Sequence, residues 1–385
     1  MQRSPLLPIF LIVAVDVLGL TIMYPLLPFY AEHFGASPTV VGLLISTYAA
    51  CQLVSGPLLG RMSDRMGRRP LLLVSQAGTF LGFLILANAW SLWLVFLSRV
   101  IDGLTAGNIS LAQAYISDVT EPAKRAKAFG VIGVAFGVGF LFGPAISGYL
   151  VQYGFAAPIY VAAGLSATSI ACTFFLLPSH RPEPAGEAEP RRLALLDWGN
   201  YIRFFRQPEL GPLLWQFFAF STSFAAFMAG FALFAERRFT WHGHPFGTRE
   251  VGYVYAWSGF IGAFVQGGLV GPLVRWFGER RLVRIGFAVS AITAAALGWT
   301  YSIALLLAVV AVSSIGSGPL RPALTSLITQ AAGRGNTGAV LGLNQSLMSV
   351  AQIVSPFVAG LLIDRGMLVS WALFPALVSV AGLLL

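Results

Sequence analysis

The sequence predicts an all-α membrane protein, with twelve transmembrane helices arranged as two pseudo-symmetric six-helix bundles. The first observation is composition: 57% of the 385 residues are hydrophobic and only 10% are charged, whereas soluble domains contain about a quarter charged residues. The second is that apolar stretches recur along the chain, each near the roughly 20 residues that a helix needs to cross a bilayer. These stretches do not alternate polar and apolar residues as the strands of a membrane barrel do. Backbone N–H and C=O groups in lipid must be hydrogen-bonded, so the stretches are expected to be helices. The third is a weak repeat between the two halves of the chain.

Short charged or Gly/Pro-containing breaks separate the predicted helices. The first helix begins near Leu6 after a single arginine, and because no small-residue cleavage site follows, we expect it to be retained rather than removed as a signal peptide. The longest polar break, 179–210, is predicted to be a cytoplasmic linker between an N-terminal bundle, 1–178, and a C-terminal bundle, 211–385. The predicted helices are 6–30, 39–59, 70–89, 91–117, 128–150, 155–177, 211–235, 250–274, 282–300, 302–330, 338–362 and 367–385.

Most basic residues lie on one side of the predicted membrane. Eighteen of the 24 lysines and arginines fall in the N-terminal segment and in the loops near 61–69, 124–127, 181–206, 275–284 and 334. By the positive-inside rule this side is cytoplasmic, so both termini are expected in the cytoplasm of a multi-pass plasma (inner) membrane protein. Because the basic residues lie in loops rather than on one face, we expect no nucleic-acid partner. Cys51 and Cys172 lie inside predicted helices, so neither a disulfide framework nor a metal site is expected.

The two halves repeat each other at an offset near 211 residues. A nearly constant offset across several regions indicates parallel halves, and such halves imply a site between them that opens alternately to each side. The matched pairs are Val41-Gly42 with Val251-Gly252, Gly60 with Gly271, Gly67 with Gly278, and Gly130, Pro144 and Gly148 with Gly342, Pro356 and Gly360.

Two acids are placed well inside predicted helices: Asp16 in the first and Asp102 in the fourth. A charged side chain at the membrane centre costs about 2.5–3.5 kcal/mol on insertion scales. This cost favours the neutral form of a carboxyl group, so such a group can take up a proton. Arg99 lies three residues before Asp102 on the same helical face, and its positive charge favours the ionised form of a nearby carboxyl group. We hypothesise that Asp16 exchanges protons, that Arg99 biases this exchange, and that Asp102 belongs to the same group. The alternatives are that Asp16 is a hydrogen-bonded packing residue and that Asp102 merely pairs with Arg99.

Arg321 is the only charge placed deep in the C-terminal half, beside Pro319 and Pro322. It is expected to meet a carboxylate or an anionic group of a substrate, and the alternative is that it snorkels to a membrane face. Five amides on helices expected to line the cavity are further substrate-binding candidates, although each alone is equally consistent with packing between helices. They are Asn108, Gln113, Gln216, Asn344 and Gln345.

The break between the second and third predicted helices contains Gly60-Arg-Met-Ser-Asp64-Arg65-Met-Gly67-Arg68-Arg69. It resembles the signature loop of the major facilitator superfamily, G-x-x-x-D-R-x-G-R-R, at every defined position. The resemblance implies the major facilitator fold and assigns these residues to a cytoplasmic gate in which Asp64 is the latch. Asp118, at the end of the fourth helix, is the expected partner of the arginines.

The fifth predicted helix contains Gly130, Gly139, Gly143, Pro144 and Gly148. Their spacing resembles the antiporter motif of drug exporters, G-(x)8-G-(x)3-G-P-(x)2-G-G, with Ser147 in place of one glycine. Small residues allow helices to pack closely. In the family, this motif separates exporters from importers.

The first and fourth helices are similar to those of the twelve-helix drug/proton antiporters, particularly the tetracycline-exporter branch. The similar segments are Asp16 through Tyr24-Pro25-Leu-Leu-Pro28, and Arg99-Val-Ile-Asp102-Gly103, where the family has R-x-x-Q-G. The resemblance implies a role for Arg99 in proton coupling. Tetracycline exporters have an acid in helix 3, a histidine in helix 8 and an acid in helix 9. The matching residues here are Gly82, Gly262 and Ser290, so tetracycline–metal exchange is not expected.

These observations predict a secondary active transporter, a proton-coupled antiporter that exports small amphipathic, drug-like organic molecules by alternating access. Its expected partners are the small-molecule substrate, protons and the lipid bilayer, and we expect a monomer without a cofactor. The sequence contains no nucleotide-binding motif, paired carboxylates or metal-spaced cluster, so it is not expected to be an enzyme or to use ATP. Two alternatives remain: a proton-coupled symporter that imports an organic anion, and a lysolipid transporter.

Overall fold

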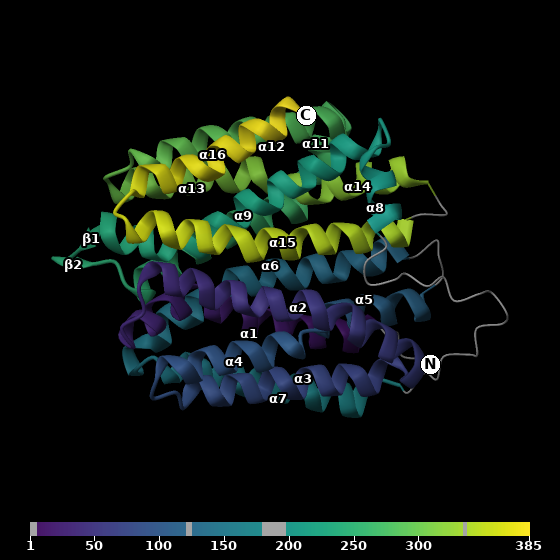
Figure 1. The fold of residues 1–385 in the computed structure, drawn as a ribbon, viewed down its shortest axis with the longest axis horizontal. Helices are drawn as coiled ribbons and strands as arrows, with labels where there is room; N and C mark the ends of the chain where they lie inside the picture. Colours follow the sequence, from purple (N-terminus) through teal and green to yellow (C-terminus); the bar gives the residue numbers. More distant parts are fainter. Residues whose placement is uncertain (1–5, 121–124, 179–197, 334–336) are drawn as a thin grey trace. The chain divides into compact units, whose positions relative to one another are not determined.

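The computed structural model describes residues 6–120, 125–178, 198–333 and 337–385. Nearly all of them are helical (Figure 1). The first helices are α1 (Leu6–His33), α2 (Pro38–Met66), α3 (Arg68–Ala87), α4 (Leu92–Leu104), α5 (Asn108–Val119), α6 (Arg125–Leu150) and α7 (Ala156–Leu176). They are followed by α8 (Trp198–Phe205), α9 (Leu210–Arg238), α10 (Thr248–Phe264), α11 (Val270–Phe277), α12 (Glu279–Gly298), α13 (Ile303–Ser317), α14 (Leu320–Ala332), α15 (Thr337–Asp364) and α16 (Leu368–Leu384).

Eleven helical stretches among the described residues are long and apolar enough to cross a membrane. Three of them join two consecutive helices: α4 with α5, α10 with α11, and α13 with α14. The final helix, α16, has 17 residues and is shorter than the others. The predicted all-α membrane fold is therefore confirmed, with eleven full-length spans and a shorter twelfth apolar helix. Basic residues at positions 3, 124, 181, 191, 192 and 334, which contribute to the predicted orientation, lie outside the described residues.

The predicted break between the second and third helices is much shorter in the structure than in the prediction. The second helix continues to Met66 instead of ending near 59, so Gly60, Asp64 and Arg65 are helical. Gly67 alone separates α2 from α3, with a φ of 94°, which favours glycine because a Cβ would be strained there. Gly278, its match in the repeat, has a φ of 72° between α11 and α12.

The fourth predicted helix, 91–117, is interrupted at residues 105–107. The Ser75 hydroxyl of α3 accepts a hydrogen bond from the Gly107 N–H at 2.9 Å and donates to the Thr105 carbonyl. Ser55 of α2 donates to the Gly103 carbonyl at 2.8 Å. The Gly107 N–H also donates to the Thr105 carbonyl at 2.8 Å, and the Ala106 N–H to the Gly103 carbonyl at 3.2 Å. Serines of two neighbouring helices thus add hydrogen bonds to a turn that is partly paired within itself, which stabilises a break inside a membrane.

Other departures from the predicted helices occur in the C-terminal half. The predicted helix 302–330 is divided at Gly318 and Pro319 into α13 and α14, and the predicted helix 250–274 contains a π-helical turn, Val265–Leu269. This turn includes adjacent glycines at 267 and 268, which weaken a regular α-helix. A hairpin of β1 (Thr240–Trp241) and β2 (His244–Pro245) follows α9, and its turn residues, His242 and Gly243, both have positive φ.

Contacts divide the chain into two compact units. The first unit contains Met1–Gly35, Thr47–Arg192 and Thr248–Ala256, and the second contains Ala36–Ser46, Leu193–Gly247 and Trp257–Leu385. The apolar core of the first unit lies mainly among α1, α3 and α5, and that of the second mainly among α9, α12 and α14. The domain boundaries expected from the sequence stay a prediction.

The internal repeat coincides with a close helix crossing in each unit. In the first unit, Gly252 of α10 lies against α6, where an added Cβ would be 2.5 Å from the Pro144 carbonyl oxygen. In the second unit, Gly42 of α2 lies in the same way against the Pro356 carbonyl of α15. Neither site has room for a side chain, so the matched glycine and proline residues form the same kind of contact twice.

Replacing Ser75 tests how the interruption in the fourth helix is stabilised. Ser75→Ala is expected to lower the free energy of unfolding by about 0.5–1.5 kcal/mol for each hydrogen bond lost. The Thr105 carbonyl and the Gly107 N–H each lose one partner and keep their bond to each other. Thr168→Ala is the control, since this exposed hydroxyl bonds to a carbonyl one turn earlier in its own helix. Thermal unfolding in detergent would contradict the role of Ser75 if both variants melted at the same temperature.

Candidate functional site

The candidate site in the first unit is built around Asp16, near the middle of α1. Its carboxyl group lies beside the side chains of Ser169 of α7 and Gln76 of α3, which interact with it electrostatically. Gln76 Nε2 also donates to Ser169 Oγ at 2.7 Å, so the three side chains form one polar cluster. Helix α7 packs against both α1 and α3 (Figure 1), which brings these residues together from distant parts of the sequence. Among the described residues, Asp16 forms no ion pair.

The second acid, Asp102, lies in the same unit on α4. Its carboxyl group is 3.3 Å from Nη1 of Arg99 and contacts the Thr79 side chain. Both members of the pair are buried, with 6% of Asp102 and 4% of Arg99 exposed. Asp102 is also close enough to Asp16 to interact with it electrostatically. The structure therefore brings together all three residues for which the sequence suggests a role in proton coupling.

The charges of this cluster determine what it can do. With both carboxyl groups ionised, Asp16, Asp102 and Arg99 have a net charge of −1, and protonation of one acid brings the cluster to neutrality. Arg99 pairs with Asp102 rather than Asp16. Asp16 is only half-buried, but an ionised carboxylate inside a membrane helix without a cationic partner is still costly. Asp16 is thus the better placed of the two to take up a proton.

The antiporter motif packs α6 directly against the helix that contains Asp16. An added Cβ at Gly139 would lie 2.5 Å from Val17 Cγ1, and one at Gly143 would overlap the Thr21 hydroxyl. Thr21 Oγ1 donates to the Gly139 carbonyl at 2.8 Å across this contact. The glycines of the motif therefore bring α6 close to α1 within one or two turns of Asp16.

The remaining motif residues lie farther along α6. Pro144 and Gly148 pack against the start of α10, and Ser147 is fully buried with no hydrogen-bond partner for its hydroxyl among the described residues. Gly130 belongs to α6, but its surroundings are outside the described part of the chain.

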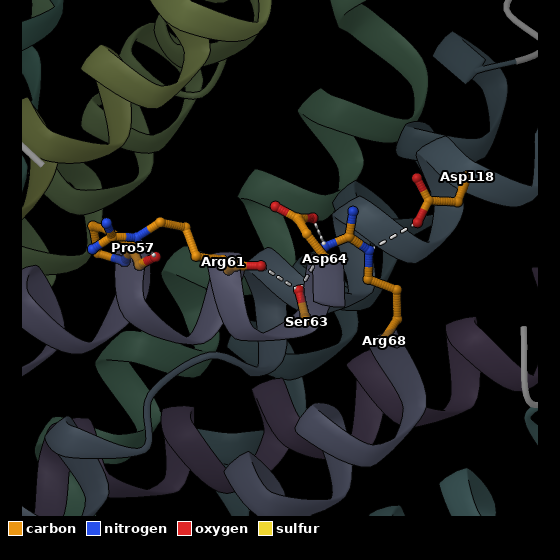
Figure 2. Close-up of polar contacts among 7 residues, drawn as sticks. Pro57, Arg61, Ser63, Asp64, Arg68 and Asp118 are labelled. Carbon is orange, nitrogen blue, oxygen red and sulfur yellow. Dashed lines mark hydrogen bonds and ion pairs between the residues drawn. The ribbon is translucent and has the colours of Figure 1, made fainter. Parts of the chain in front are cut away.

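The predicted cytoplasmic gate is organised by Arg68, the first residue of α3 (Figure 2). Its guanidinium group is 2.5 Å from the Asp64 carboxylate and 2.8 Å from the Asp118 carboxylate. It also donates to the Ser63 hydroxyl. Arg69 instead bonds to the carbonyls of Thr173 and Phe174 near the end of α7. Arg68 thus joins the ends of α2 and α5 through two ion pairs.

The predicted substrate-binding residues have different surroundings. In the first unit, Asn108 Oδ1 is buried without a partner among the described residues, while Gln113 is exposed. In the second unit, Gln216 donates to the Gly382 carbonyl at 3.1 Å and thereby joins α9 to α16, as a packing residue would. Asn344 is buried, and neither of its side-chain polar atoms has a partner in the part of the chain that the structure describes.

Arg321 and Gln345 are both exposed within the second unit. Arg321 lies in the first turn of α14, directly after the interruption at Pro319, rather than within an uninterrupted helix. The structure also brings Gln76, Thr79 and Ser169 to the acids, although sequence reasoning did not select them. Neutral polar residues in apolar helices give no pattern by which they could have been chosen. No group of three or more potential metal ligands occurs in the described residues.

A multi-pass bundle with a buried acid cluster and a glycine-packed helix beside it defines a secondary transporter of small molecules rather than an enzyme. The chain belongs to the Major Facilitator Superfamily: the sequence profile of this family matches residues 9–356 and 267–385. It is 32% identical to the class G tetracycline resistance protein of Vibrio anguillarum over 92% of this chain and 89% of that protein. It is 26% identical to multidrug resistance protein 2 of Bacillus subtilis over 96% and 91% of the two chains.

Solved structures show the same fold at low sequence identity. A human organic anion transporter has a TM-score of 0.75 and 22% identity, covering 100% of this chain and 99% of its own. A nucleoside transporter has a TM-score of 0.80 and 13% identity, covering 99% and 98%. The family match and the sequence relatives confirm both the predicted family and the predicted tetracycline-exporter-like branch.

Gly82, one of the positions at which the sequence differs from tetracycline exporters, lies next to the acid cluster. This residue of α3 occupies the position where those exporters are expected to have an acid. An added Cβ at Gly82 would lie 3.1 Å from the Asp102 Cβ and 3.2 Å from the Ser98 carbonyl oxygen. Asp102 of α4 therefore packs closely against α3 at the glycine.

The packing of α6 against α1 can be tested with two glycines of one helix. Gly143→Ala is expected to destabilise the protein by about 1–3 kcal/mol, because the added methyl group overlaps Thr21. Gly133→Ala is the matched control, since a Cβ there would meet nothing within 4 Å. Thermal unfolding and transport are measured on both variants, and a Gly143→Ala protein as stable and active as Gly133→Ala would contradict the importance of this contact.

Proposed function

We propose that this chain is a proton-coupled antiporter that exports small amphipathic organic molecules by alternating access. The observation that supports this most is the position of Asp16, which has polar partners from two helices while the neighbouring Arg99 is committed to Asp102. A carboxyl group placed in this way can hold or release a proton without breaking an ion pair. The antiporter motif packs against the same helix, so movement of α6 and the protonation of Asp16 have a direct physical connection.

In the proposed cycle, proton and substrate compete through the charge of the cluster. When Asp16 is ionised, the net charge of −1 favours a cationic amphipathic molecule. Protonation of Asp16 removes that charge, weakens the attraction and favours release. Each cycle therefore exchanges a proton for a substrate. A substrate with equal affinity for both protonation states would not be driven, because only differential affinity shifts an equilibrium.

The gate and the orientation complete the proposal. Arg68, held between Asp64 and Asp118, would stabilise the closed cytoplasmic side, and Arg65 and Arg69 belong to the same motif. The excess of basic residues on this side supports an orientation with both termini in the cytoplasm, and the proposed location is the plasma (inner) membrane. We expect the monomer to be the transporting unit, because each half supplies its own core.

Relatives named for tetracycline resistance suggest drug-like substrates, but the site departs from the pattern expected for tetracycline–metal exchange. Glycines occupy the positions of an acid and a histidine at 82 and 262, and Ser290 occupies that of a second acid. We therefore propose a substrate other than a tetracycline–metal complex. Asn108 Oδ1 and both polar side-chain atoms of Asn344 are buried without a partner among the described residues. These two amides are therefore the best candidates to bind it, with Gln113, Gln345 and Arg321 as exposed candidates.

Asp16→Asn tests the proton role because asparagine preserves size and hydrogen bonding but cannot titrate. In proteoliposomes with a proton gradient, ethidium extrusion and the accompanying proton flux are expected to fall at least tenfold. Ethidium binding to the wild-type protein is expected to weaken as the pH is lowered, since protonation removes the negative charge, whereas binding to Asp16→Asn is expected to be independent of pH.

The control is Asp364→Asn, the same change at an exposed acid that accepts a hydrogen bond from Thr39. It is expected to behave like the wild type. Gradient-driven transport that survives Asp16→Asn would exclude the proposed proton site. Uptake of an organic anion with an inward proton gradient, abolished by Arg321→Gln, would instead support the symporter alternative. Transport restricted to lysolipids would support the lipid-handling alternative.

A further inference from the structure

The second unit contains a partly open cavity that the proposed proton cycle does not use. It has a volume of about 110 Å³ and lies among α9, α10, α12, α13 and α16. Its described lining residues all belong to the second unit. An engineered apolar cavity of about 150 Å³ is known to hold a benzene molecule, so the size is that of a single aromatic ring.

The walls of the cavity combine aromatic rings with hydroxyl groups. Phe220, Phe224, Phe287 and Trp371 supply apolar surface, and seven serines and one threonine also line the space. Trp371 is fully buried and its indole N–H is already used, since it donates to the Ala226 carbonyl at 3.3 Å. The tryptophan therefore contributes a ring surface rather than a polar contact. Phe224 is 40% exposed, so one wall reaches the surface of the unit.

Most of the hydroxyl groups already donate their hydrogen atoms within the protein. Ser379 donates to the Pro375 carbonyl at 2.8 Å, and Ser223 to the same carbonyl or to Ser379. Ser314 donates to the Val310 carbonyl at 2.9 Å, which leaves Ser258 as the donor in their 2.8 Å contact. A hydroxyl that donates in this way still has lone pairs that can accept a hydrogen bond. The cavity wall therefore offers chiefly acceptors.

Ser290 of α12 differs from these serines. Ser290 is one of the residues that line the cavity, and its buried hydroxyl oxygen has no hydrogen-bond partner among the described residues. Leaving a buried hydroxyl unpaired costs free energy that a ligand group could recover. Among the described residues that line the cavity none is charged. A charged ligand would therefore have no counter-ion there, which disfavours both cations and anions.

We propose that this cavity binds a small neutral molecule with one aromatic ring and one hydrogen-bond donor, the chemistry of a simple phenol. The ring packs against the phenylalanines and Trp371. The phenolic O–H donates to a serine lone pair and its oxygen can accept from Ser290. The site is separate from Asp16 and its partners, which lie in the first unit, and its ligand need not be the exported substrate.

Fluorine NMR of 4-fluorophenol with the purified full-length protein in detergent tests the proposal without requiring transport. Saturable line broadening is expected with the wild type. Ala294→Phe, which fills the cavity from α12, is expected to abolish it, and Ser290→Ala to weaken the affinity several-fold. Ile292→Phe is the matched control, because this residue of the same helix is 68% exposed. The control also shows how much probe partitions into the detergent.

Two related probes separate the parts of the argument. 4-Fluoroanisole has the same ring without a donor and is expected to bind several-fold more weakly, while the anionic 4-fluorobenzoate is expected not to bind. Equal affinities for the phenol and the anisole, or saturation unchanged by Ala294→Phe, would overturn the proposal. If Ala294→Phe does not fold, Ser290→Ala decides: an affinity equal to that of the wild type contradicts the site.

Discussion

A carboxyl group inside a membrane needs polar partners, and the first unit assembles them around Asp16 of α1 from two other helices. Ser169 and Gln76 contact it from α7 and α3, and Gln76 bonds to Ser169 in turn. Because Arg99 forms its ion pair with Asp102, Asp16 can be either protonated or ionised without breaking that pair. Gly139 and Gly143 allow α6 to pack closely on α1. The helix that contains Asp16 is therefore in direct contact with the helix that the family resemblance associates with export.

The same constraint governs the backbone. A helix interrupted in a membrane must find new partners for its free N–H and C=O groups, and at residues 105–107 Ser75 supplies both kinds while Ser55 pairs with Gly103. This interruption follows Asp102 directly, so the polar contacts that stabilise it also fix the end of the helix that holds the ion pair. The same hydrogen bonds thus stabilise the helix break and help to position the Arg99–Asp102 ion pair.

Hydropathy was sufficient to predict the helices, because length and apolar content decide whether a segment can cross a bilayer. It was insufficient at helix ends: Asp64 and Arg65 were predicted in a loop but lie in the last turn or two of α2, since a charged segment can stay helical once it leaves the membrane. The acids could be identified because charges are rare in these helices. Gln76 and Ser169 could not, since neutral polar residues become functional only through partners from other helices. Gln216 shows the converse, as its contact with Gly382 is a packing contact.

Isotope-edited infrared spectroscopy of the purified protein would test most directly whether Asp16 titrates. A pH titration is expected to show one carboxylic acid C=O band that disappears as the pH rises, and this band is expected to be missing from Asp16→Asn but present in Asp364→Asn. A band that persists unchanged in Asp16→Asn, or its absence from the wild type at every pH at which the protein transports, would contradict the assignment of proton exchange to Asp16.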